Sequence, residues 1–346
     1  MPVQAQTEPP KPRLPWLPGV IATWGGYILA ALGAFLFASK GIWIKVAYGY
    51  HVDASSLLAL RLMMATPFFV AGGIATWLRQ KARGLEGPPA ISARPELYIK
   101  TLAVGALGYW MASYTDFESL VTLSPQFERL IIFTYPLFVI LFGAAFFRQA
   151  MRTSALWTFA LAYAGIGFIF VTDLRAHGSA IVTGAIWCLV SSVSFALYLL
   201  LAKPLIKRLG ASLFTSWAMC GAALVTFMHF FIVHRLSDIP WSHGLLTLVL
   251  GLAIGATVAP SYLTNFALSR ISSQANAVIS FINPIFTLLL SALILRQHIS
   301  LADVAGTLLV LIGVGLHTWL DHRATAGEQA TVGQAAGAPQ ASSSTG

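Results

Sequence analysis

Long apolar runs separated by short polar stretches dominate the chain. A helix needs about 20 apolar residues to cross a bilayer, and a single helix satisfies its backbone hydrogen bonds within one segment. The pattern therefore predicts an all-α integral membrane protein with about ten transmembrane helices. We expect them near 25–46, 56–78, 98–117, 126–147, 155–173, 181–202, 212–233, 244–267, 272–294 and 302–320.

Composition and charge agree with a lipid environment. Of the 346 residues, 57% are hydrophobic and 10% are charged, whereas soluble domains carry about 25% charged residues. The net charge of +9 does not indicate nucleic-acid binding, because Lys and Arg are scattered between the apolar runs. Most of them fall on one side if the N-terminus is cytoplasmic, so the positive-inside rule predicts a multi-pass inner-membrane protein with both termini cytoplasmic. The polar stretches 1–24 and 321–346 are expected to be cytoplasmic tails, the second one disordered.

An internal repeat divides the apolar region. Shifting the chain by 148 residues aligns 113–149 with 261–297 without a gap, and thirteen of 37 positions are identical, including matched Ser, Gln, Pro and Arg residues. The first helix matches the sixth at a shift of 158. We therefore predict two five-helix repeats, 25–173 and 181–320. Because five is odd, the second repeat is inverted relative to the first, an arrangement that many transporters use.

Several segments resemble those of a known family. They are ALRLMMATPFF at 59–69, FERLIIFTYP at 127–136, INPIFTLLLSALIL at 282–295 and the Gly-x-Gly sequences that close each half. Over roughly 25–320 the chain resembles the EamA family of the drug/metabolite transporter superfamily, and this resemblance implies transport of amino acids, other metabolites or drugs. The family usually has Gly-Glu after the fourth and ninth helices, where this chain has Arg148-Gln149 and Arg296-Gln297. No role for that acidic residue is carried over.

Ionisable residues inside the predicted spans are the candidate substrate-binding or coupling residues, because a charge in the membrane is costly unless it faces a cavity or a partner. All belong to the first repeat, and their counterparts in the second repeat are uncharged. The candidates are Lys40, Arg61, Asp116, Glu118, Glu128 and Arg129.

Roles can be suggested for these charges. Arg61 and Arg129 are expected to face carboxylates of helix three or four, or a substrate carboxylate or phosphate. Glu128 or Asp116 could take up a proton. Glu128 and Arg129 are adjacent, about 100° apart on a helix, and are not expected to pair directly. An ion-pair network without a ligand role is the alternative, and Lys40 could instead extend its amine to the membrane surface.

Two prolines fall inside predicted spans at equivalent places in the repeat. Pro136 and Pro284 each remove a backbone donor and should bend their helix, which would free a carbonyl to face a cavity. A tolerated kink is the alternative.

The sequence favours transport over catalysis. It contains no nucleophile, metal or phosphate-loop motif, so no enzyme activity, cofactor or metal is expected. The prediction is a secondary transporter, an exporter or exchanger of a small metabolite such as an amino acid, that alternates access between its repeats. A passive channel, a non-transporting scaffold and a membrane-embedded enzyme are the alternatives. The expected partners are the lipid bilayer and a small-molecule substrate, and no nucleic-acid partner is expected. Protons as a further partner and assembly into a homo-oligomer are left as open alternatives.

Overall fold

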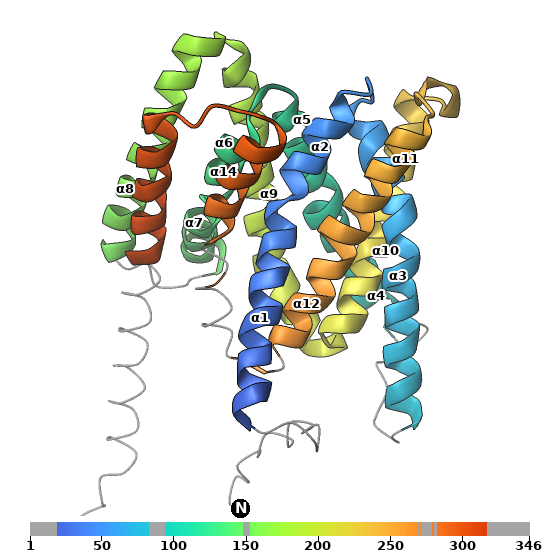
Figure 1. Cartoon of the computed structure of the whole chain (residues 1–346). Helices are drawn as coiled ribbons and strands as arrows, with labels where there is room; N and C mark the ends of the chain where they lie inside the picture. Colours follow the sequence, from blue (N-terminus) through green and yellow to red (C-terminus); the bar gives the residue numbers. More distant parts are fainter. Residues whose placement is uncertain are drawn as a thin grey trace, which may run out of the picture.

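The computed structural model describes residues 19–82, 94–147, 153–268, 270–271, 279 and 282–316. Within these ranges every regular element is a helix and no strand occurs, so the predicted all-α class is confirmed. The helices stand roughly upright beside one another (Figure 1). In chain order they are α1 (Gly19–Ala38), α2 (Lys40–Tyr48), α3 (Ala54–Ala82), α4 (Pro95–Gly105), η1 (Ala106–Met111), α5 (Ala112–Thr122), α6 (Pro125–Ile132), α7 (Tyr135–Phe147), α8 (Thr153–His177), α9 (Ala180–Leu209), α10 (Ala211–Val233), η2 (Leu236–Asp238), α11 (His243–Leu250), η3 (Gly251–Val258), α12 (Ala259–Leu268) and α14 (Asn283–Ile294), followed by a helix over Leu301–Leu316.

Six helical stretches of the described chain are long and apolar enough to cross a membrane. They are Trp24–Tyr48, Ala54–Ala82, Pro125–Phe146, Ala180–Leu209, Ala211–Val233 and His243–Thr264. Each overlaps a predicted span. Helix also covers the third and fifth predicted spans, and two shorter apolar helices lie where the ninth and tenth were predicted. Parts of those last two spans lie outside the described residues, so the number ten stays a prediction.

The first half of the chain packs against the second through several helix pairs. Helix α1 contacts α12, α3 contacts α10, and α5 contacts α9. In Figure 1, α1 begins at the lower end of the bundle, whereas α2, α5, α6 and α11 lie toward its upper end.

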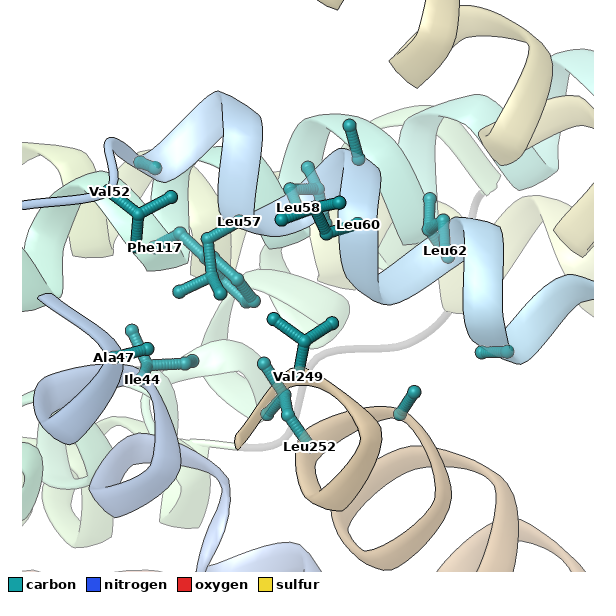
Figure 2. Packing of buried hydrophobic residues seen from close by; sticks show 14 of the residues in the cluster. Ile44, Ala47, Val52, Leu57, Leu58, Leu60, Leu62, Phe117, Val249 and Leu252 are labelled. Carbon is teal, nitrogen blue, oxygen red and sulfur yellow. The ribbon is translucent and has the colours of Figure 1, made fainter. Parts of the chain in front are cut away.

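An apolar cluster fixes the upper part of the bundle. Figure 2 shows Ile44 of α2 and Leu57 of α3 close to Phe117 of α5, with Val249 and Leu252 from the second half. All five side chains are at least 99% buried. This packing holds α2, α3 and α5 together and so positions the charged residues that these helices carry.

Asp53 is the last residue of the connection between α2 and α3, and its side chain binds the N-terminal end of α3. Its Oδ1 atom accepts hydrogen bonds from the Ser55 hydroxyl at 2.6 Å and the Ser56 amide at 2.9 Å, and such bonds satisfy free donors at a helix N-terminus. The same oxygen lies 3.3 Å from Nε2 of His234, just after α10. The loop is thus tied to a helix of the second half.

Two predicted spans are each interrupted near the middle of the bundle. The first is divided at Ser39 into α1 and α2, and the fourth is divided at 133–134 into α6 and α7. Two other long helices contain π-helical segments, η1 between α4 and α5 and η3 between α11 and α12. Broken helices and π-helical segments are both frequent at functional sites.

Candidate functional site

A cavity of about 840 Å³ lies between the two halves. Its walls come from the broken helices, from the π-helical segments and from α3, α5, α9 and α10. Most of the lining is apolar or aromatic, and four side chains are charged. The charged residues are Lys40, Arg61, Asp116 and Arg129. Four of the six candidate residues therefore meet at one cavity.

Lys40 and Asp116 form an ion pair at this cavity. Lys40 is the first residue of α2, directly after the break at Ser39, and its Nζ atom donates to Oδ2 of Asp116 at 2.6 Å. The side chain of Lys40 is 20% exposed and that of Asp116 only 2%. The amine of Lys40 thus points to a buried carboxylate instead of the membrane surface.

Glu128 lies next to this pair but does not line the cavity. It occupies the first turn of α6 and is fully buried. Its carboxyl group interacts with that of Asp116. Neither oxygen of Glu128, nor Oδ1 of Asp116, has a hydrogen-bond donor among the described residues. Two interacting carboxyl groups, one fully buried and one at the edge of the cavity, therefore lack donors for three of their four oxygens.

Arg129 bridges α6 to the break in the first span. Its Nη2 atom donates to the carbonyl of Phe37 at 3.4 Å, one of the carbonyls that the end of α1 leaves without a helical partner. Its Nε atom lies 3.9 Å from Oε2 of Glu128. The prediction that these adjacent residues do not pair is therefore wrong, because a long guanidinium side chain reaches around the helix. At 3.9 Å the contact is electrostatic and not a hydrogen bond.

Arg61 is a buried cation that has no carboxylate at ion-pair distance among the described residues. It is 4% exposed in α3, and its Nη2 atom donates to the hydroxyl of Ser113 at 3.2 Å. Its guanidinium carbon lies 5.0 Å from the centre of the Phe117 ring, a cation–π contact. The Nε atom has no hydrogen-bond partner, and no carboxylate of the described chain lies within ion-pair distance. A guanidinium in this state can bind an anion that enters the cavity.

Glu118 lies apart from this group. It follows Asp116 by two residues on α5, which turns its side chain to a different face of the helix, and it is half-buried outside the cavity lining. Its counterpart in the second repeat, Phe266, is exposed. The counterparts of Glu128 and Arg129 lie outside the described residues.

The two prolines begin helices instead of bending them internally. Pro136 is the second residue of α7 and lines the cavity, and Pro284 is the second residue of α14. A missing amide donor is tolerated at that position. The carbonyls left free at the breaks find partners on other helices. Thr287 of α14 donates to the carbonyl of Ala38 at 3.1 Å. Ser192 of α9 donates at 3.5 Å to the carbonyl of Ile132, whose helical partner would be the amide hydrogen that Pro136 lacks.

Uncharged polar residues of the cavity were missed from the sequence. Ser113 and Ser261 both line it, and the repeat alignment had already matched them. Tyr109 also lines it and receives a hydrogen bond from Tyr198 at 3.1 Å. For the two serines, identity at equivalent repeat positions was the usable signal, whereas the counterpart of Tyr109 is Thr257. Among the residues that the structure describes, no group of His, Cys, Asp and Glu is arranged to hold a metal ion.

Long apolar helices from two halves that enclose a charged cavity define a multi-pass membrane transporter. Comparison with known proteins identifies the family: the chain belongs to the EamA-like transporter family, whose sequence model matches residues 24–171 and 182–319. Members of this family are transporters and not enzymes. The EamA resemblance predicted from the sequence is confirmed.

Individual relatives agree with this assignment. The uncharacterized transporter YcbK of Bacillus subtilis (strain 168) is 28% identical over 290 residues, which cover 81% of this chain and 88% of that protein. The uncharacterized transporter YcxC of the same organism is 23% identical over 298 residues, covering 83% and 91%. A protein of known crystal structure shares the fold with a TM-score of 0.57 and 17% identity, over 87% of this chain and 98% of that one.

Proposed function

We propose that this protein is a secondary transporter that binds a small metabolite in the cavity between its halves and exposes it alternately to each side of the membrane. In this proposal ten transmembrane helices form two inverted five-helix repeats, 25–173 and 181–320. The contacts of α1, α3 and α5 with helices of the other half support a site at the repeat interface, where such transporters hold substrate. The excess of Lys and Arg in one set of loops supports an inner-membrane location with both termini cytoplasmic.

The substrate that we propose carries a carboxylate or phosphate group, as an amino acid or a related compound does. Arg61 carries this proposal, because it is a buried guanidinium at the cavity and no carboxylate of the described residues lies within ion-pair distance of it. Such a fork binds carboxylate and phosphate through two parallel hydrogen bonds. The aromatic lining, which includes Phe37, Phe133 and Phe195, suits the apolar body of such a molecule.

The test is flux of a pooled metabolite panel into proteoliposomes of the purified protein, read by mass spectrometry. Accumulation of an anionic or zwitterionic class is the expected result. Vesicles preloaded with the same compounds then distinguish export or exchange, the directions expected from the sequence, from uptake. Equilibration of compounds irrespective of charge would indicate a channel, and no flux of any compound would indicate a scaffold.

Variants of Arg61 locate the site. Arg61→Met keeps the length of the side chain and removes its charge, so the apparent affinity for the transported compound should fall at least about tenfold, as expected for loss of a charged hydrogen bond. Arg61→Lys keeps the charge but not the fork and should retain part of the transport. Arg79→Met is the matched control, since Arg79 lies exposed in the last turn of the same helix. Wild-type affinity in Arg61→Met would contradict the proposed site.

A further inference from the structure

We infer that Asp116 and Glu128 form a proton-binding site in which one proton is held between the two carboxyl groups, beside the substrate cavity. This inference rests on the proposed transport function for its biological meaning. The site itself follows from the arrangement of the two acids.

The first argument concerns hydrogen bonding. Both acids are buried, at 2% and 0% exposure, and they interact with each other. Three of their four carboxyl oxygens have no donor among the described residues. A buried acceptor without a donor costs free energy. A single proton on one carboxyl group turns that oxygen into a donor for the other group, and so satisfies two of these three oxygens.

The second argument concerns charge. Two carboxylates that share a buried site are not readily ionised together, because like charges repel strongly where water is excluded. Lys40 compensates one negative charge through its 2.6 Å contact with Asp116. Nε of Arg129 lies 3.9 Å from Oε2 of Glu128, and the Nη2 atom of Arg129 donates to the carbonyl of Phe37 instead. The second negative charge is therefore compensated less well, and a bound proton removes it.

The neighbouring helices define the rest of the environment. Helix α2 brings Lys40 and Tyr48, whose hydroxyl donates to the carbonyl of Phe117 at 2.6 Å. Helix α9 brings Cys188, whose thiol lies 3.4 Å from the carbonyl of Glu128. Helix α14 contains no titratable side chain in its described length. On α8, Phe170 packs against α6, and the charged residues of that helix come after Phe170, toward its end.

The arrangement also defines a route for the proton. Asp116 lines the cavity, whereas Glu128 does not. A proton from water in the cavity therefore reaches Asp116 first and passes to Glu128 along the contact between the two carboxyl groups. A metabolite or metal ion cannot follow, since Glu128 has no exposed surface.

Proton binding would couple to anion binding. With both acids ionised, the cations Lys40, Arg61 and Arg129 exceed the acids by one positive charge. A proton on the pair raises that excess to two and strengthens the attraction for an anion at Arg61. Proton and anion should therefore bind together and cross the membrane in the same direction.

The direct test is infrared difference spectroscopy of the full-length protein in lipid, recorded while the pH is changed and without any substrate. The wild type should show a carbonyl band of a protonated carboxylic acid that titrates with pH. Glu128→Gln should abolish this band, while Glu128→Asp, which keeps the carboxyl group, should retain it with a changed midpoint. Glu118→Gln makes the same chemical change two residues from Asp116, outside the site, and should leave the band intact.

The outcomes separate the two proposals. A band that persists in Glu128→Gln, or that is also lost in Glu118→Gln, overturns the proton site. In vesicles that contain a pH-sensitive dye, the metabolite panel should drive proton entry in the wild type and Glu118→Gln but not in Glu128→Gln, and flux without proton movement overturns the coupling. A titrating band assigned to Glu128 together with no flux of any compound would leave the proton site standing and refute the transport function.

Discussion

Replacing Lys40 by Met should destabilise the protein strongly, because it leaves a buried carboxylate without its closest cation. At 2.6 Å the attraction between two unit charges is about 6 kcal/mol for an effective dielectric constant of about 20. Part of this is offset by desolvation of the two ions. Removing one partner of a buried pair generally costs about 3–5 kcal/mol. We expect the lower end of that range, since the side chain of Lys40 is 20% exposed.

The double variant Lys40→Met with Asp116→Asn makes this prediction specific. Replacing both partners removes the uncompensated charge, so most of the lost stability should return. The four proteins of this double-mutant cycle would be compared by reversible unfolding in mixed detergent micelles, which gives the free energy of unfolding. Lys45→Met is the matched control. It makes the same change on the same helix at a residue whose amine only donates to an exposed carbonyl at 3.3 Å, and it should cost less than about 1 kcal/mol.

Two results would refute this reasoning. One is a loss for Lys40→Met no larger than that of Lys45→Met, which would mean that the ion pair contributes nothing. The other is equal instability of the single and double variants, which would attribute the loss to packing around Lys40 instead of charge.

Two further predictions concern stability. Gly105→Ala in α4 should lower the free energy of unfolding by about 1–3 kcal/mol, because a Cβ atom there would overlap the backbone of α10 and overpacking has that cost. Gly167→Ala is the control in the same unfolding assay and should not destabilise the protein, because a Cβ atom there meets open space. Burial alone would raise the pKa of Asp53, but hydrogen bonds from Ser55 and Ser56 outweigh burial, so the pKa is lowered. The ionised carboxylate therefore stabilises the folded protein at any pH above the unfolded-state pKa of about 3.9, and this stabilisation is lost as the pH falls through the lower folded-state pKa. Melting temperatures of the wild type and Asp53→Asn should therefore differ at neutral pH and converge below about pH 4, and a difference that grows in acid would contradict this account.

Hydrophobic length and the internal repeat were sufficient to predict the helical class and the family. Both depend on local composition or on positions that the sequence itself repeats. The breaks at Ser39 and at 133–134 were harder to predict, because nothing in the apolar runs marks where a helix stops inside the membrane. Pro136 indicated a disturbance nearby, yet the interruption precedes it and the proline begins the next helix.

The candidate charges could be named from the sequence, but their partners could not. Lys40 and Asp116 are 76 residues apart, and their contact depends on how α2 and α5 pack. The 100° rule for adjacent residues failed for Glu128 and Arg129, since it describes where side chains leave the helix and not how far a guanidinium extends. The distance of Arg61 from every carboxylate of the described residues is a property of the assembled bundle, so no local pattern reveals it.

The two π-helical segments lie at equivalent positions of the internal repeat. Adding the repeat shift of 148 to η1, residues 106–111, gives 254–259, which overlaps η3 at Gly251–Val258. The same local irregularity therefore occurs at the same place in both copies of the repeat. The charges of the cavity belong to one copy only. The two halves thus share an irregular backbone beside the cavity and differ in the charges that line it.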